Sequence, residues 1–237
     1  MNIEARLDEV RAEYLRRTTQ GDSQLLRQVE EYTSARQGKM LRPHMLLAAA
    51  ATRGEEHLMQ RRTLLLAVCV EMLHNASLLH DDVIDRADTR RGQPSVNHRW
   101  NNAVAVLVGD YLLTQIMELL DEVGDSDATR QVNATVKSMV EAELLQLEVG
   151  GRKSEVGDNS DLLHPTSYLK IVDGKTANLF ALAAALGNPD YRDFGLHYGR
   201  LFQLRDDIAD GEATPYTHAL LIAEEDAIKQ MDRILNI

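Results

Sequence analysis

The spacing of apolar residues limits most strongly what this chain can fold into. Apolar residues recur every three to four positions over long stretches, for example in Val104–Leu120 and Met139–Leu147, and no stretch of any length alternates as a strand does. Aromatic residues make up only 5% of the chain, while Leu, Ala, Glu and Arg are abundant, and this composition favours helices over strands. We therefore expect an all-α fold.

The breaks between the helical stretches are few. Linker-like sequence occurs at Gly124–Asp127 and at Gly150–Pro165, and Pro43 suits the first turn of a helix. A chain of 237 residues is long enough for one large domain with a substantial core. We expect a single domain over residues 1–237.

Charge and cysteine content exclude several classes of protein. The formal net charge of -11 argues against nucleic acid as the main partner. Cys69 is the only cysteine, so no internal disulfide can form, and its apolar neighbours indicate a buried structural thiol in a reducing, cytoplasmic setting. The first 17 residues are charged and lack the apolar core of a secretion signal. Polar residues interrupt the apolar stretch Leu64–Leu79, which predicts a buried helix rather than a membrane span.

Two clusters of aspartates carry the strongest functional signal. Each has the form DDxxD: Asp81, Asp82 and Asp85 in LLHDDVIDRADTRRG, and Asp206, Asp207 and Asp210 in FQLRDDIAD. Residues four apart share one face of a helix, so the first and last carboxylates of each cluster project together. Such carboxylates repel each other unless a cation lies between them, and their hard oxygen ligands suit Mg²⁺.

A solvated acidic face is the simpler explanation for one such cluster in an acidic chain. Two clusters are harder to explain in this way, because apolar residues precede each of them, as in Leu78–Leu79 and Leu201–Phe202. These flanks predict that both sets of carboxylates emerge from the core into a cavity.

Basic residues supply the charge that a diphosphate requires. They are Lys39 and Arg42 in GKMLRP, Arg90 and Arg91 after the first cluster, and Lys175 beside Thr176 in DGKTANLF, with His74 two turns before Asp81. Arginine binds phosphate oxygens in a bidentate way, and the start of a helix also favours anions. Taken singly, each is more simply explained as a surface charge, or for His74 as a core histidine. Their combination indicates a diphosphate site.

The chain resembles the trans-isoprenyl diphosphate synthase (polyprenyl synthetase) family, which includes farnesyl, geranylgeranyl and longer polyprenyl diphosphate synthases. The resemblance runs from about Gly38 to Asp210, and its markers follow the family's order: GKMLRP, EMLHNASLLHDDVID, RRGQPSV, VGDYLL, GKTANLF and FQLRDDIAD. It implies a helical bundle around a central cavity, of the isoprenoid synthase type, usually as a homodimer.

The resemblance also implies a role for each residue. The isopentenyl diphosphate site would comprise Lys39, Arg42, His74 and Arg91. The allylic diphosphate would contact Arg90, Lys175, Thr176 and Gln203. Mg²⁺ would be held by Asp81, Asp82, Asp85, Asp206, Asp207 and Asp210. The residues closest to the chemistry would be Asp81, Asp82, Asp85, Arg90, Lys175 and Asp206.

The implied reaction is the condensation of isopentenyl diphosphate with an allylic diphosphate. Mg²⁺ and basic side chains stabilise the departing pyrophosphate, so the allylic C–O bond ionises. The double bond of the adjacent isopentenyl diphosphate attacks the resulting cation, and a proton is then lost. No protein residue is assigned as the general base.

Small residues before the first cluster bear on product length. In the family, the product grows down a tunnel whose floor lies one turn before the aspartates, and members with short products carry bulky aromatic residues there. This sequence has Ala76 and Ser77, which predicts an open tunnel and an all-trans product longer than farnesyl. Closer helix packing is the alternative reason for two small residues.

The sequence after Asp210 departs from the family. GEATPYTHALLIAEEDA replaces the usual lysine- and glycine-rich stretch, so we expect a shortened C-terminus with the covering segment absent or reduced. A regulatory subunit of a heteromeric prenyl synthase is therefore one alternative, although such subunits tend to lose aspartates. A class I terpene cyclase is another, but a cyclase binds no second diphosphate and would not need Lys39, Arg42 and Arg91.

Overall fold

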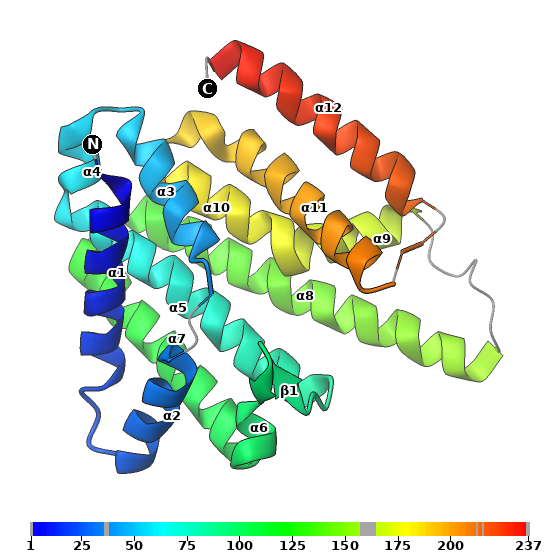
Figure 1. The fold of residues 1–237 in the computed structure, drawn as a ribbon, viewed down its shortest axis with the longest axis horizontal. Helices are drawn as coiled ribbons and strands as arrows, with labels where there is room; N and C mark the ends of the chain where they lie inside the picture. Colours follow the sequence, from blue (N-terminus) through cyan, green and yellow to red (C-terminus); the bar gives the residue numbers. More distant parts are fainter. Residues whose placement is uncertain (1, 36–37, 157–164, 212, 215, 236–237) are drawn as a thin grey trace. The chain divides into compact units, whose positions relative to one another are not determined.

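The computed structural model describes residues 2–35, 38–156, 165–211, 213–214 and 216–235. Helices dominate these residues, and the only strands among them are two of two residues each, as the apolar spacing predicted. The chain divides into two compact units, Met1–Ser126 and Asp127–Ile237. Figure 1 labels most of their helices. The expectation of one domain over residues 1–237 stays a prediction.

The first unit is built around one buried helix. Its elements are α1 (Ile3–Thr18), α2 (Gln24–Ser34), α3 (Leu41–Ala51), α4 (Glu55–Met59), α5 (Arg61–Ile84), β1 (Thr89–Arg90), β2 (Gln93–Pro94), α6 (Val96–Arg99) and α7 (Asn102–Val123). Helix α5 packs most extensively against α7 and also against α3 and α1. Every residue from Leu65 to Leu73 is buried, so α5 is the core of this unit.

Burial explains the apolar character of α5 and the state of its cysteine. Both α5 and α7 are long and apolar enough to cross a membrane by length and composition. However, 67% of the apolar window of α5 is buried inside the protein, as expected of a core helix. Cys69 is 1% exposed, and burial raises the pKa of its thiol to about 12. This confirms the prediction of a structural thiol.

Local signals set the helix ends. Ser23 caps α2, accepting a hydrogen bond from the Leu26 backbone N–H at 3.2 Å, and Asn101 caps α7 in the same way through Val104, at 2.9 Å. Gly124 ends α7 with a left-handed backbone, φ 66°. The predicted break at Gly124–Asp127 is therefore confirmed.

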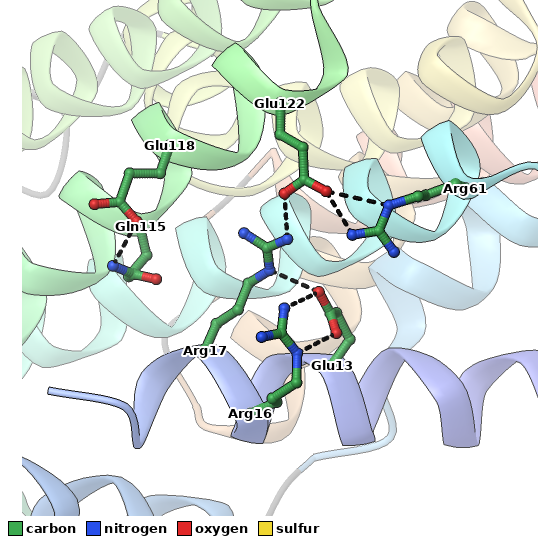
Figure 2. A network of polar contacts seen from close by, with 7 residues as sticks. All are labelled: Glu13, Arg16, Arg17, Arg61, Gln115, Glu118 and Glu122. Carbon is green, nitrogen blue, oxygen red and sulfur yellow. Dashed lines mark hydrogen bonds and ion pairs between the residues drawn. The ribbon is translucent and has the colours of Figure 1, made fainter.

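Ion pairs tie the ends of three helices together in the first unit (Figure 2). Glu122 near the end of α7 accepts hydrogen bonds from Arg17 of α1 and from Arg61 at the start of α5. Arg17 also reaches Glu13, whose pKa is lowered to about 2, mainly by its hydrogen bond with Arg16. The network fixes α1 against the α5–α7 pair.

The second unit consists of α8 (Ser126–Val156), α9 (Pro165–Val172), the π-helical turn η2 (Asp173–Ala177), α10 (Asn178–Gly187), the 3₁₀ turn η3 (Pro189–Tyr191), α11 (Arg192–Ala209) and α12 (Thr217–Leu235). Its core helix is α10, in which every residue after Asn178 is buried. Helix α11 packs against both α10 and α12. A Cβ atom on Gly199 would lie 2.6 Å from Ala177 Cα, so glycine permits the close approach of α11 to η2.

The predicted loop at Gly150–Pro165 is wrong in its first part. Helix α8 continues through Gly150 and Gly151 to Val156, and residues 157–164 lie outside the described residues. Two glycines lower helix propensity by only about 2 kcal/mol in total, and good helix formers lie on both sides of them, so the helix continues.

A buried acid in the first unit gives a prediction about pH. Glu30 of α2 is 1% exposed and accepts a hydrogen bond from the Tyr14 hydroxyl at 3.4 Å, and burial raises its pKa from 4.5 to about 7. The folded state therefore keeps a proton that the unfolded state loses near pH 4.5. As a result, the free energy of unfolding falls as the pH rises from about 4.5 to about 7, and levels off above.

Glu30→Gln should remove this pH dependence and raise the free energy of unfolding at pH 8 by up to roughly 3 kcal/mol. Urea denaturation at pH 5 and pH 8 measures the free energy of unfolding of each variant. The exposed neighbour Glu31, changed to Gln, is the control and should keep the wild-type slope. Equal pH slopes in wild type and Glu30→Gln would contradict the assignment.

Candidate active site

The first aspartate cluster lies at the C-terminal end of α5. Asp85 caps the helix with helical backbone angles, and its N–H donates to the Asp81 carbonyl at 2.8 Å. Asp81 and Asp85 therefore share one face, as predicted. Arg86 then adopts a left-handed backbone with φ 53°, and the Ala87 N–H donates to the Asp82 carbonyl at 2.9 Å. This is a Schellman ending, which reverses the chain directly after the cluster.

The second cluster has the same local structure at the end of α11. Asp210 caps the helix, and its N–H donates to the Asp206 carbonyl at 2.9 Å. Gly211 follows with φ 77° and donates to the Ile208 carbonyl at 3.3 Å. Two segments far apart in the sequence thus present their carboxylates from the same kind of helix end.

A helix C-terminus is an unfavourable place for a carboxylate. The helix dipole puts partial negative charge there, so each acid at this position is destabilised unless a cation lies nearby. Asp85, Asp206 and Asp210 are exposed and Asp81 is partly exposed. The position favours cation binding over the alternative of a merely solvated acidic face.

The middle aspartate of each cluster is different. Asp82 is 3% exposed, and its Oδ1 accepts a hydrogen bond from Arg90 Nε at 2.8 Å. Burial raises its pKa, and the Arg90 cation opposes this rise. Asp207 is 9% exposed and accepts hydrogen bonds from the Tyr168 hydroxyl and, at 2.7 Å, from Gln203 Nε2. Both middle carboxylates are held by protein donors.

A short hairpin positions the two arginines that follow the first cluster. Strands β1 and β2 pair Arg90 with Gln93, and Arg91 and Gly92 form the turn with φ values of 52° and 73°. Two positive φ values in a two-residue loop are typical of a type I′ turn. The turn exposes Arg91 at its tip, while Arg90 reaches back to the buried Asp82.

Basic residues from two segments, α3 and the β1–β2 hairpin, gather around His74. Burial lowers the pKa of His74 well below its usual value, and the nearby charges of Arg42, Arg91 and Arg90 lower it further, so the imidazole is neutral. A Cβ atom on Gly38 would lie 2.8 Å from Arg91 Nη2, which places the segment before α3 beside this arginine. Lys39, next in the chain, is exposed. The structure therefore brings together Arg42, His74 and Arg91, three of the four residues predicted to bind isopentenyl diphosphate.

Glu71 belongs to this group and was missed by the sequence analysis. It is 2% exposed, and burial raises its pKa while the charges of Arg42 and Arg91 oppose the rise. In the sequence it counted only as an interruption of an apolar stretch. Its position one turn before His74 was the signal that could have identified it.

The predicted allylic-site residues of the second unit lie on a π-helical turn. Lys175 Nζ lies 2.8 Å from Glu143 Oε2 and donates to Gln146 Oε1 at 3.0 Å, both on α8. Thr176 Oγ1 donates to Gln203 Oε1 at 2.6 Å. Such π-helical turns are rare in proteins, and those that occur often lie at functional sites.

Backbone strain gathers at the predicted site. Among the described residues, those other than glycine with positive φ are Met40, Arg86 and Arg91. The first lies between the two basic residues of GKMLRP, the second follows the first aspartate cluster, and the third is itself a predicted ligand of isopentenyl diphosphate. Strained conformations of this kind concentrate at functional sites.

The two predicted chain-length residues differ in position. Ala76 is 1% exposed, whereas Ser77 is partly exposed and its hydroxyl donates to the His74 carbonyl at 2.9 Å. Ser77 shares the face of Asp81, four residues later. A cavity of about 60 Å³, open to solvent, borders the neighbouring face of α5, where Asn75 and Asp82 lie, and neither small residue lines it. The tunnel role stays a prediction.

In the part of the chain that the structure describes, protein side chains alone do not complete a metal site. Within the described residues, no group of three or more His, Cys, Asp or Glu side chains converges as metal ligands. Pairs of carboxylates at a helix end nevertheless fit Mg²⁺, which retains water and takes further ligands from substrate phosphates.

Residues 23–220 match the sequence profile of the polyprenyl synthetase family. The chain belongs to this family. A family member, the all-trans-nonaprenyl-diphosphate synthase (geranyl-diphosphate specific) of Rhodobacter capsulatus, is 38% identical over 195 residues, which is 78% of this chain and 57% of that protein. Heptaprenyl diphosphate synthase component 2 of Geobacillus stearothermophilus is 34% identical over 75% of this chain and 55% of its own length.

The fold is likewise that of a solved family member. The crystal structure of polyprenyl synthase from Caulobacter crescentus, complexed with calcium and isoprenyl diphosphate, matches with a TM-score of 0.77 and 34% identity. The match covers 86% of this chain and 62% of that one. The chain spans little more than half the length of the curated relatives described above.

Proposed function

We propose that this chain is a trans-prenyltransferase that condenses isopentenyl diphosphate with an allylic diphosphate. The observation that carries the proposal is the repeated helix ending: two exposed or partly exposed aspartates at a helix C-terminus, with an anchored aspartate between them, occur in both clusters. The group of Arg42, His74 and Arg91 supplies a separate site for a second diphosphate.

The outer aspartates act as the metal ligands. These are Asp81, Asp85, Asp206 and Asp210, with Mg²⁺ as the proposed ion. Asp82 and Asp207, which the sequence also suggested as ligands, instead fix the ends of α5 and α11, since donors within the protein occupy their carboxylates. When bound, Mg²⁺ neutralises charge on the pyrophosphate leaving group.

The basic residues then divide between two substrates. Arg90, Lys175, Thr176 and Gln203 hold the allylic diphosphate, and their charges and donors stabilise the bridging oxygen as the allylic C–O bond breaks. Glu143 and Gln146 hold the Lys175 ammonium in place for this role.

Lys39, Arg42 and Arg91 bind isopentenyl diphosphate, and the neutral His74 adds a hydrogen bond without adding charge. The double bond of this substrate attacks the first carbon of the allylic cation and forms the new C–C bond. A proton leaves the adjacent carbon and is taken up by the released pyrophosphate, so the reaction needs no protein base.

The product is an all-trans chain longer than farnesyl. The small Ala76 and Ser77 support this proposal, and so do the long-chain products named for the relatives. We also propose a cytoplasmic homodimer. The exposed apolar side chains Leu107 and Met117 on α7, 66% and 68% exposed, support a protein contact there.

A second candidate function is the catalytic or regulatory subunit of a two-component synthase. The similarity to a relative named component 2 favours it.

Incubation of the purified chain with Mg²⁺, labelled isopentenyl diphosphate and geranyl, farnesyl or geranylgeranyl diphosphate tests the proposal. We expect labelled polyprenyl diphosphates longer than farnesyl, and none when a chelator removes the metal. Cyclic hydrocarbons without label would instead indicate a terpene cyclase. Activity that requires a second polypeptide would support the two-component alternative.

Bulky residues one turn before the first cluster should shorten the product. Ser77→Phe places a ring on the face of Asp81, and Ala76→Phe does so at the adjacent buried position, where some loss of stability is also expected. Chromatographic sizing of the products measures the effect. Ser77→Ala is the matched control and should leave product length unchanged. Wild-type length in both Phe variants would refute the open tunnel.

A further inference from the structure

A chain of hydrogen bonds ends at the buried aspartate of the second cluster. The Tyr168 hydroxyl of α9 donates to Asp207 Oδ2, and Gln203 Nε2 donates to Asp207 Oδ1 at 2.7 Å. Thr217, in the first turn of α12, donates to the Tyr168 oxygen at 3.5 Å. Both oxygens of the Asp207 carboxylate are thus bound by side chains of the protein, and Tyr168 is the partner from outside α11.

Packing fixes Tyr168 in place. Its ring is 7% exposed and forms a core cluster with Val172 and Leu204, against which Leu220 and Leu221 of α12 also pack. Burial, followed by the hydrogen bond to Asp207, raises the pKa of the tyrosine, so the hydroxyl keeps its proton and remains a donor. A rigid aromatic ring with a protonated hydroxyl is suited to hold a carboxylate in one orientation.

The carboxylate of Asp207 is directly coupled to the end of α11. Asp206 precedes it in the chain, and the Asp210 N–H bonds the Asp206 carbonyl at 2.9 Å in the last turn of the helix. Both flanking acids are exposed at a helix end, where their mutual repulsion and the helix dipole favour fraying. An anchor on the middle residue opposes that fraying.

We propose that Tyr168 is a positioning residue for the second aspartate cluster: its hydroxyl fixes Asp207 and thereby the last turn of α11, so that Asp206 and Asp210 are oriented for a divalent ion bound to diphosphate. This inference rests on the proposed function for the identity of the ion, but the anchoring of α11 can be tested without any metal. Residues that orient metal ligands through hydrogen bonds commonly change metal affinity by 10-fold to 100-fold when altered.

Tyr168→Phe removes the hydroxyl and keeps the ring. In the metal-free protein, we expect amide hydrogen exchange in residues 205–210 to become at least several-fold faster, with α10 unchanged. With Mn²⁺ and inorganic pyrophosphate as probes, titration calorimetry should show the Mn²⁺ dissociation constant increased roughly tenfold. The Mg²⁺ concentration for half-maximal activity should rise in parallel, while the KM for isopentenyl diphosphate stays within twofold.

Two further variants keep the test decisive. Tyr191→Phe is the matched control, because Tyr191 is 8% exposed and lies at the opposite end of α11, where its ring contacts Phe194. Tyr191→Phe should match the wild type in amide hydrogen exchange, in Mn²⁺ affinity and in the Mg²⁺ dependence of activity. Thr217→Val removes the hydroxyl that contacts Tyr168 without enlarging the side chain, and should show the same changes at smaller size if Tyr168→Phe does not fold.

The outcomes separate the two proposals. Unchanged exchange in residues 205–210 of Tyr168→Phe, or of Thr217→Val in its place, overturns the positioning role whatever the metal does. Faster exchange with unchanged Mn²⁺ affinity also overturns it, because the anchor would then not serve the ligands. Failure of the wild-type chain to bind Mn²⁺ with pyrophosphate counts against the proposed function, and the inference about metal falls with it.

Discussion

Carboxylates at the C-terminal end of a helix are the constraint on which the rest of this structure depends. Both aspartate clusters place acids where the helix dipole is negative, and each helix ends at the last acid of its cluster. The fold reduces the cost for the middle acid of each cluster by burying it among donors. The outer acids are exposed or partly exposed, so a divalent cation can reach them. The feature that destabilises the helix ends is thus the one on which the proposed metal-assisted ionisation depends.

The two anchors are chemically different. In the first cluster Arg90 binds the buried Asp82, so a residue predicted to contact substrate also stabilises the helix end. In the second cluster, the neutral hydroxyl of Tyr168 and the amide of Gln203 do so. Gln203 in turn accepts a hydrogen bond from Thr176, which connects the anchor to the predicted allylic site. The proposed substrate contacts and the stability of the helix ends therefore involve the same side chains in both units, and we expect substitutions there to affect both properties.

Much of the fold and part of the candidate site could be predicted from the sequence. Apolar spacing predicted the helices, and the i, i+4 relation predicted that Asp81 and Asp85 share a face. The family motifs predicted the gathering of Arg42, His74 and Arg91. The separate role of Asp82 could not be predicted, because DDxxD does not indicate which carboxylate is buried. Tyr168 was missed because its partner Asp207 lies 39 residues away on another helix. The helical course of Gly150–Val156 was missed because glycine lowers helix propensity without preventing a helix. The expectation that both clusters open into one cavity stays a prediction.

The central claim is that the outer aspartates of both clusters bind diphosphate through metal. Binding of a non-cleavable allylic thiodiphosphate, measured by titration calorimetry with and without Mg²⁺, tests it most directly. We predict that Mg²⁺ strengthens binding to the wild type. Asp81→Asn and Asp206→Asn should each reduce this Mg²⁺-dependent increase in affinity by a factor of at least ten, while the affinity measured without metal stays nearly unchanged. If either variant kept the full effect of Mg²⁺, the role assigned to its cluster would be contradicted.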